Sequence, residues 1–139
     1  MEKANEREIS DIDEFIISSV PKYKDWELKA INKADSFNKE FQELITKYCW
    51  GEIWTKTTLT DKQRSMNNLC MLSALNKWHE FSIHFRGAIK NGCTLEELKD
   101  VLLQITVYCG VPCGVEAFRY ARKIIEEDGL NVEKEFGQL

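Results

Sequence analysis

The chain has 139 residues, of which 43% are hydrophobic and 30% are charged, and its formal net charge is −4. This balance is typical of one globular domain and excludes a disordered chain, while the negative charge argues against nucleic acid as a partner. The charged first eight residues lack the apolar core of a signal peptide, and no apolar run reaches membrane-spanning length. We therefore expect a soluble, cytoplasmic protein that contacts neither nucleic acid nor membrane. The five cysteines are odd in number and scattered, as is usual in a reducing compartment.

Apolar residues recur mostly at helical spacing, and no segment alternates as a strand does, so the sequence predicts an all-α fold. Residues 9–20 form a first amphipathic helix that Pro21 ends, and a short polar helix covers residues 26–33. A third helix follows the cap candidates Asp35 and Ser36 and covers about residues 37–48. Its inner face is predicted to hold Phe41, Leu44, Ile45 and Tyr48. Gly51 is expected to break this helix, so that residues 50–54 form an aromatic-rich turn.

Two capping boxes mark later helices, one that begins after Thr60 and one that begins after Thr94. The first of these helices is predicted to stop at Asn76, because asparagine tolerates the left-handed conformation that often closes a helix. A new helix then runs from about Lys77 to the stop signal at residues 91–92.

The helix after Thr94 is expected to run into Gly110, with an apolar series of Leu98, Val101, Leu102, Ile105 and Tyr108. Pro112 suits the first turn of a last helix, which ends near residues 128–129. Counting from the N-terminus, we expect a helical bundle of about six or seven helices.

Both histidines of the chain lie in the helix after Asn76, as His79 and His84. Glu80 and His84 are four residues apart and therefore side by side on one helix face, although such a pair is often an ordinary surface contact. Phe81, Phe85 and Ala88 form one apolar stripe on this helix and Ile83 and Gly87 another, which favours burial of the helix between layers or at a subunit interface. A carboxylate and an imidazole in such surroundings form a candidate acid/base pair, whereas His79 is expected at the surface.

From about residue 41 to residue 127 the sequence resembles the carboxymuconolactone decarboxylase family of the alkylhydroperoxidase-like superfamily. The resemblance rests on residues 41–54, including the turn Trp50-Gly51-Glu52-Ile53-Trp54, and on Arg64-Ser65, Glu80, His84, Arg86-Gly87-Ala88, Asn91-Gly92, Glu96-Glu97-Leu98, residues 101–104, Tyr108 and Gly110-Val111-Pro112. Departures from the pattern are Asn76 in place of glycine, and Cys109 and Cys113 in place of small residues. The resemblance divides the chain into an N-terminal helical arm, residues 1–35, and a decarboxylase-like domain, residues 36–139.

The resemblance implies loss of carbon dioxide from 4-carboxymuconolactone, giving the β-ketoadipate enol-lactone in the catabolism of protocatechuate. The reaction needs no cofactor and no metal, because electrons from the leaving carboxylate can flow through the ring double bond into the lactone carbonyl. The protein must supply a cationic clamp for the remaining carboxylates, a donor to the developing oxyanion and an acid for carbon. The resemblance also implies that the substrate is a small anionic lactone and that the protein is a homo-oligomer, a trimer or a hexamer.

Within this reaction we expect His84 to donate the proton and Glu80 to orient its ring and tune its pKa. Glu52 is a second acid/base candidate, with a surface carboxylate as the alternative. Arg86 is the natural carboxylate clamp, but its position two residues from His84 turns it to nearly the opposite face, so a salt bridge across an interface is an equal alternative. Trp50, Trp54 and Tyr108 are substrate-binding candidates, although residues of this kind are more often part of the core.

Two other functions stay open from the sequence. Because Lys77 and Glu80 stand where the related alkylhydroperoxidases carry their Cys-x-x-Cys, a peroxidatic dithiol is absent from that position. Cys109 and Cys113 could instead support a thiol-based peroxidase or disulfide reductase, although buried structural thiols are the commoner role for such residues. The third possibility is a non-catalytic, oligomeric binding protein.

Overall fold

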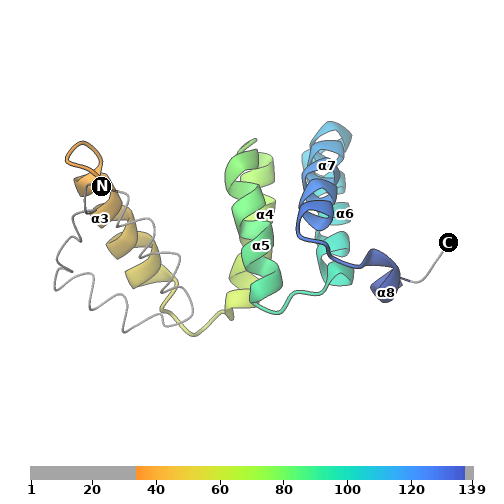
Figure 1. The fold of residues 1–139 in the computed structure, drawn as a ribbon, viewed down its shortest axis with the longest axis horizontal. Helices are drawn as coiled ribbons and strands as arrows, with labels where there is room; N and C mark the ends of the chain where they lie inside the picture. Colours follow the sequence, from red (N-terminus) through yellow and green to blue (C-terminus); the bar gives the residue numbers. More distant parts are fainter. Residues whose placement is uncertain (1–33, 137–139) are drawn as a thin grey trace, which may run out of the picture. The chain divides into compact units, whose positions relative to one another are not determined.

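The computed structural model describes residues 34–136, except for the side chain of Glu135, and all regular structure in this range is helical. The predicted all-α class is confirmed. The elements are α3 (Lys39–Ile45), the π-helix η2 (Thr46–Ile53), α4 (Asp61–Ala74), α5 (Trp78–Lys90), α6 (Leu95–Cys109), α7 (Val111–Glu127) and α8 (Val132–Phe136) (Figure 1). The helices predicted over residues 9–20 and 26–33 lie outside the described residues.

The chain divides into two compact units, Met1–Thr58 and Leu59–Leu139. The first contains α3 and η2, and the second contains α4 to α8. The predicted boundary between an arm and a domain at residue 35 stays a prediction, because nearly all of that arm precedes the described residues.

In the first unit the helix predicted over residues 37–48 begins at Lys39 and does not stop at Gly51. It widens into η2, which ends at Ile53, so the predicted break and aromatic turn are wrong. The physical reason is tertiary: Trp50 and Trp54, one turn apart, are both buried, with ring centroids 5.3 Å apart. Burial of two indole rings outweighs the roughly 1 kcal/mol that a glycine costs inside a helix.

The inner face predicted for this helix is also wrong for three of its four residues. More than 60% of the surface of Phe41, Leu44 and Tyr48 is exposed. The fully buried side chain in this segment is Thr46, whose hydroxyl donates to the carbonyl of Gln42 over 2.7 Å.

Both predicted capping boxes are confirmed in the second unit. The Thr60 hydroxyl accepts from the Gln63 N–H over 3.1 Å, and the Gln63 side chain accepts from the Thr60 N–H over 2.9 Å. Thr94 and Glu97 make the same reciprocal pair at the start of α6, at 3.1 and 2.9 Å. Each box satisfies two backbone donors that a helix start would otherwise leave unpaired.

The chain reverses between α4 and α5 at Asn76, as predicted. Asn76 is the one non-glycine residue in the described range with positive φ, 59°, and the backbone around it forms a Schellman turn. The Lys77 N–H donates to the Leu72 carbonyl over 2.8 Å, and the Asn76 N–H donates to the Ser73 carbonyl over 3.0 Å. The Asn76 side chain also accepts from the indole N–H of Trp78, so α5 starts two residues later with its first side chain anchored.

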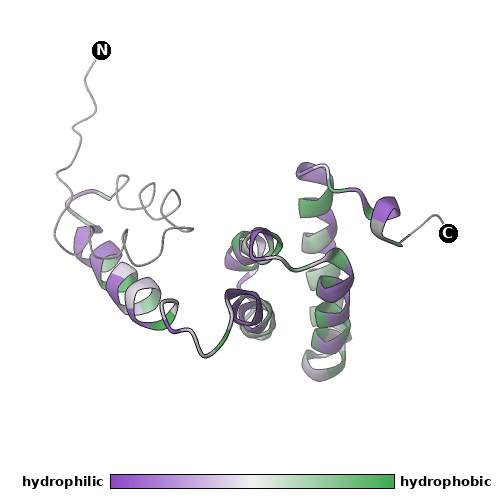
Figure 2. Ribbon diagram, turned by 90° about the horizontal axis from the view of Figure 1, so that it is seen from below, coloured by the Kyte–Doolittle hydropathy of each residue, from purple (hydrophilic) through white to green (hydrophobic). Residues whose placement is uncertain are grey.

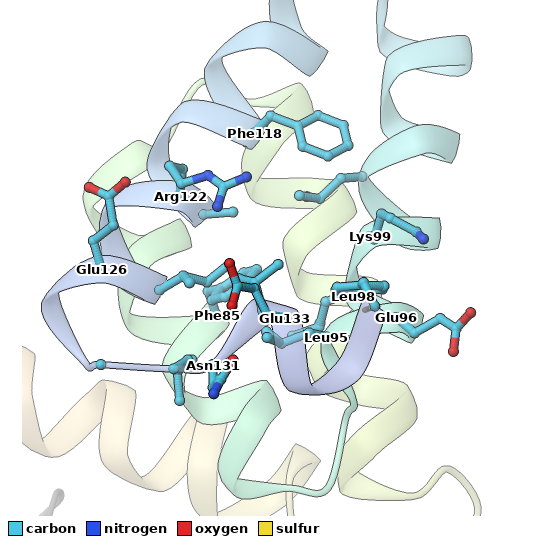
Figure 3. A pocket seen from close by; sticks show the side chains of 17 residues that line it. Phe85, Leu95, Glu96, Leu98, Lys99, Phe118, Arg122, Glu126, Asn131 and Glu133 are labelled. Carbon is cyan, nitrogen blue, oxygen red and sulfur yellow. The ribbon is translucent and has the colours of Figure 1, made fainter. Parts of the chain in front are cut away.

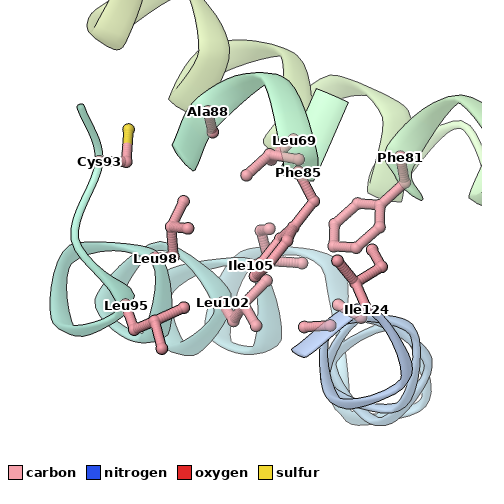
Figure 4. Close-up of a cluster of buried hydrophobic side chains, with 12 residues drawn as sticks. Leu69, Phe81, Phe85, Ala88, Cys93, Leu95, Leu98, Leu102, Ile105 and Ile124 are labelled. Carbon is pink, nitrogen blue, oxygen red and sulfur yellow. The ribbon is translucent and has the colours of Figure 1, made fainter. Parts of the chain in front are cut away.

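The core of the second unit is built from α4, α5, α6 and α7 (Figure 4). Each of these helices carries both hydrophobic and hydrophilic residues, as helices with one buried face do (Figure 2). The buried cluster consists of Leu69, Phe81, Phe85, Ala88, Cys93, Leu95, Leu98, Leu102, Ile105, Ala117, Ala121 and Ile124. The apolar stripe predicted on α5 is thus confirmed, and so is most of the series on α6. Tyr108 is the exception, because this residue of the last turn of α6 is 82% exposed.

The remaining helix ends follow the sequence signals. α5 ends at Lys90, just before the predicted stop at residues 91–92. α6 ends at Cys109, Gly110 has a φ of 96°, and Pro112 lies in the first turn of α7. α7 ends before Asp128 as predicted, and the short helix α8 is an element that the sequence did not indicate. No helix in residues 34–136 has the length and apolar character needed to cross a membrane.

A close approach of α6 and α7 depends on Gly114. A Cβ atom at this buried position would lie 2.1 Å from the Thr106 hydroxyl oxygen and 2.7 Å from its Cβ. Thr106 cannot turn away easily, since its hydroxyl donates to the Leu102 carbonyl over 2.8 Å and its χ1 is stiff.

We therefore predict that Gly114→Ala lowers the free energy of unfolding by about 1–3 kcal/mol through overpacking. The matched control is Gly87→Ala in α5, where an added Cβ meets no atom within 4 Å. Replacing this glycine lowers the conformational entropy of the unfolded chain, so Gly87→Ala should raise the free energy of unfolding by about 0.4–1 kcal/mol. Urea unfolding followed by circular dichroism measures both, and equal effects of the two substitutions would contradict the packing argument.

Candidate active site

The candidate site lies on the hairpin of α4 and α5, which pack side by side (Figure 1). Different faces of α5 carry residues of different character. Phe81 and Phe85 enter the core, while Glu80 and His84, one turn apart, share another side of the helix. Glu80 and His79 are exposed and His84 is partly buried, so only one of the two histidines is enclosed by the fold, as the sequence predicted.

His84 contacts α4 through Asn68. The amide nitrogen Nδ2 of Asn68 lies 3.3 Å from the ring nitrogen Nδ1 of His84. This contact joins residues 16 positions apart in the chain, and it exists only because the turn at Asn76 lays α5 back along α4.

Burial governs the charge of this ring. Removal from water lowers the pKa of His84, and the nearby carboxylate of Glu80 raises it by a smaller amount. The net shift is downward from an ordinary value of about 6.5, so His84 is predominantly neutral at pH 7. A neutral imidazole is a hydrogen-bond donor and a base rather than a ready source of protons.

Glu80 acts on His84 through its electric field. It lies in the first turn of α5, one helical turn before His84. The amide of Asn68 also lies against the ring. The orienting role expected of Glu80 stays a prediction.

Arg86 points away from this face, as its spacing indicated. Its guanidinium holds both carboxylate oxygens of Asp128 and one of Glu127, at the end of α7, with nitrogen–oxygen distances between 2.8 and 3.2 Å. The salt bridge is formed within the chain, whereas the alternative expected from the sequence was a salt bridge across an interface. This arginine ties the end of α7 to α5.

The other predicted site residues lie on other elements of the chain. Trp50, Trp54 and Glu52 belong to the first unit, where the two rings are buried and the carboxylate is exposed. Tyr108 is solvent-exposed in the last turn of α6. Their roles in catalysis or substrate binding stay predictions.

Three thiols come together where α6 ends and α7 begins. Cys109 interacts with Cys113 and with Cys70 of α4, and the Cys113 thiol donates to the Ser73 carbonyl over 3.3 Å. Burial raises the pKa of Cys70 and of Cys113. A peroxidatic thiol needs the opposite shift, since the thiolate is the nucleophile. The shifts at Cys70 and Cys113 are opposite to this need. The thiol-based alternative, which also involves Cys109, stays a prediction.

A cavity of about 1380 Å³ in the second unit lies elsewhere (Figure 3). It is lined by residues of α5, α6, α7 and α8 and by the segment before α8, and its walls are mostly apolar, with Phe85 and Phe118 among them. Neither Glu80 nor His84 lines it, so this cavity is distinct from the candidate site. In residues 34–136 no group of three His, Cys, Asp or Glu side chains is placed to hold a metal ion.

The sequence analysis missed Asn68 and gave no role to Arg64. The two lie one turn apart on α4 and are both partly buried. Asparagine is a poor residue for a helix interior unless its side chain has a partner, so its position in the middle of α4 was an available signal. What the sequence did not reveal was the identity of that partner on another helix.

Sequence comparison assigns this all-α chain to a known family. Residues 39–123 match the carboxymuconolactone decarboxylase family, and the chain belongs to this family. It is similar to the nitrosuccinic acid decarboxylase npaB of Metarhizium robertsii, with 39% identity over 70% of this chain and 68% of that protein. It is also similar to the 4-carboxymuconolactone decarboxylase of Acinetobacter baylyi, with 31% identity over 76% of this chain and 79% of that protein.

Arg86 gives a direct test of a structural against a catalytic role. We predict that Arg86→Met lowers the free energy of unfolding by about 1 kcal/mol, because it removes a bidentate ion pair at the protein surface. The KM for a polycarboxylate substrate should remain within about twofold of the wild-type value, a change too small for a lost substrate contact. Urea unfolding and steady-state kinetics measure the two effects, and a large rise in KM with unchanged stability would restore Arg86 as the clamp.

Proposed function

We propose that the protein is a cofactor-independent decarboxylase of small polycarboxylates, with 4-carboxymuconolactone as its substrate. The proposal is supported by membership of the decarboxylase family and by the two relatives, both of which are named as decarboxylases. The single observation in the structure that carries it is the partly buried, neutral His84 beside Asn68 and Glu80.

The decarboxylation requires little from the protein beyond electrostatic stabilisation and positioning of the substrate. When 4-carboxymuconolactone loses carbon dioxide, the bonding electrons pass through the ring double bond to the lactone carbonyl, giving a dienolate that is then protonated on carbon. A hydrogen-bond donor aimed at the developing oxyanion stabilises the transition state more than the ground state. A neutral imidazole can supply such a donor without any change of its own charge.

A cation on the same side of the hairpin completes the proposed site. Arg64 precedes Asn68 by one turn on α4 and therefore shares its helix face. A guanidinium can bind a carboxylate through two parallel hydrogen bonds. We assign the clamp for the carboxylate that is not lost to Arg64.

Nitrosuccinic acid is a second candidate substrate, because the relative that acts on it is 39% identical to this chain. A nitro group next to the leaving carboxylate accepts the electrons as a nitronate, in the way the lactone carbonyl accepts them as a dienolate. Both compounds are polycarboxylates that contain their own electron sink. One arrangement of an oxyanion donor and a carboxylate clamp would serve either reaction.

Turnover of both compounds by the purified protein tests the proposal, with loss of lactone absorbance and release of carbon dioxide as readouts. We expect His84→Ala to lower kcat on the order of 100- to 1000-fold, the usual loss for one oxyanion donor. Glu80→Gln should have a smaller effect, because Glu80 acts on the ring only through its field. Arg64→Met should raise KM about 10- to 100-fold, as expected when a charged hydrogen bond to substrate is lost.

His79→Ala is the matched control, since it removes the exposed histidine of the same helix and should leave kcat unchanged. If the folded wild-type protein decarboxylates neither compound, the proposed function is wrong. If it does so and His84→Ala keeps a near-normal kcat, the reaction stands but the site does not.

We also propose that the protein works as a homo-oligomer, a trimer or a hexamer. The support is an exposed apolar surface on the last turns of α6 and the first turns of α7, where Val107, Tyr108, Val111 and Val115 are 59–82% exposed. A group of large apolar residues this exposed is unusual on a monomer and typical of an interface.

Light scattering coupled to size exclusion should therefore give three or six times the 16.2 kDa of one chain. The double substitution Val107→Lys and Val115→Lys should lower the measured mass, because charges in an apolar interface are costly to bury. Gln104→Lys, at an exposed polar position of α6, is the control. A wild-type protein of monomer mass would contradict the assembly.

A further inference from the structure

The contact between Asn68 and His84 fixes which ring nitrogen carries the proton. An amide nitrogen bears only hydrogens, so Nδ2 of Asn68 donates to Nδ1 of His84, and Nδ1 must accept with its lone pair. In the neutral ring the single N–H is then on Nε2. We propose that Asn68 is a positioning residue that holds His84 as the Nε2–H tautomer.

The inference rests on the proposed function for its catalytic meaning, and it defines the role of His84 more narrowly. A ring whose Nδ1 accepts from an amide can present only the Nε2–H as a donor. Because burial keeps this ring neutral, His84 stabilises the oxyanion as a hydrogen-bond donor, and the proton for carbon comes from another group or from water. This role differs from the one expected from the sequence, in which His84 itself donates the proton to carbon.

The groups around His84 agree with a neutral donor. On α5 Glu80 is the charged residue whose field raises the pKa, and burial outweighs it. From α4 the ring meets the uncharged Asn68, with Arg64 one turn further along the same helix face. α7 also packs on α5, and its carboxylates at Glu127 and Asp128 are bound to Arg86.

An acceptor in place of the donor should reverse the tautomer. In Asn68→Asp the carboxylate cannot donate to Nδ1 but can accept from it, so the proton should move to Nδ1. The added negative charge should also raise the pKa of His84. Asn68→Leu removes the contact with little change in size, and should leave a mixture of tautomers.

The tautomer can be read without any substrate, by long-range proton–nitrogen correlation spectra of the two histidines. The chain has two histidines, so the exposed His79 serves as an internal reference in the same spectra. We expect wild-type His84 to be protonated on Nε2 and His84 in Asn68→Asp to be protonated on Nδ1. Asn67→Asp, the same charge change at the exposed neighbouring residue, should leave the wild-type pattern.

Kinetics give the second readout. Activity should require the neutral ring, so kcat/KM should fall as the pH drops through the pKa of His84, which lies below its ordinary value of about 6.5. Asn68→Asp should move this fall to higher pH and lower the limiting kcat on the order of 10- to 100-fold, as loss of an orienting partner does. Asn67→Asp should do neither.

Two results would overturn the inference. One is a wild-type His84 protonated on Nδ1, and the other is an unchanged tautomer in Asn68→Asp. Both can be measured whether or not the lactone and nitrosuccinic acid are substrates. Failure of the proposed function would appear separately, as absence of turnover by a wild-type protein with the Nε2–H tautomer.

Discussion

The left-handed turn at Asn76 is the constraint on which the histidine site depends. Asn68 lies eight residues before this turn and His84 eight residues after it, so reversal of the chain at Asn76 brings the two opposite each other. A turn one residue earlier or later would rotate α5 by about 100° relative to α4 and separate them. The Schellman hydrogen bonds and the contact between Asn76 and Trp78 hold the turn in one register. Backbone geometry thus fixes the side-chain chemistry.

Signals that act within a few residues were sufficient to predict much of the fold. The capping boxes at Thr60 and Thr94 and the turn at Asn76 depend on local hydrogen bonds and on φ, which the sequence specifies directly. Failures arose where distant packing overrides local preference. The buried rings of Trp50 and Trp54 carry a helix through Gly51, where propensity alone predicts a stop.

In the candidate site too, contacts within one helix could be predicted from the sequence, and contacts between helices could not. Glu80 and His84 could be paired from their spacing, because neighbours on one helix follow from the helical repeat. The contact between His84 and Asn68 joins residues 16 positions apart, and the contact between Arg86 and Asp128 joins residues 42 positions apart. No local rule specifies either contact. Helical geometry showed correctly that Arg86 faces away from His84, but it could not show what lies on the other side.

A neutral histidine donor also suggests why one scaffold could serve chemically different acids. A lactone dienolate and a nitronate differ in shape, yet each develops negative charge on oxygen as carbon dioxide leaves. An imidazolium would lose its proton to such an anion and then have to recover it in each cycle, whereas a neutral N–H stabilises the anion and remains unchanged. On this reasoning His84 and Asn68 provide what the two reactions share, and the choice of substrate falls to the residues that hold the carboxylate that is retained.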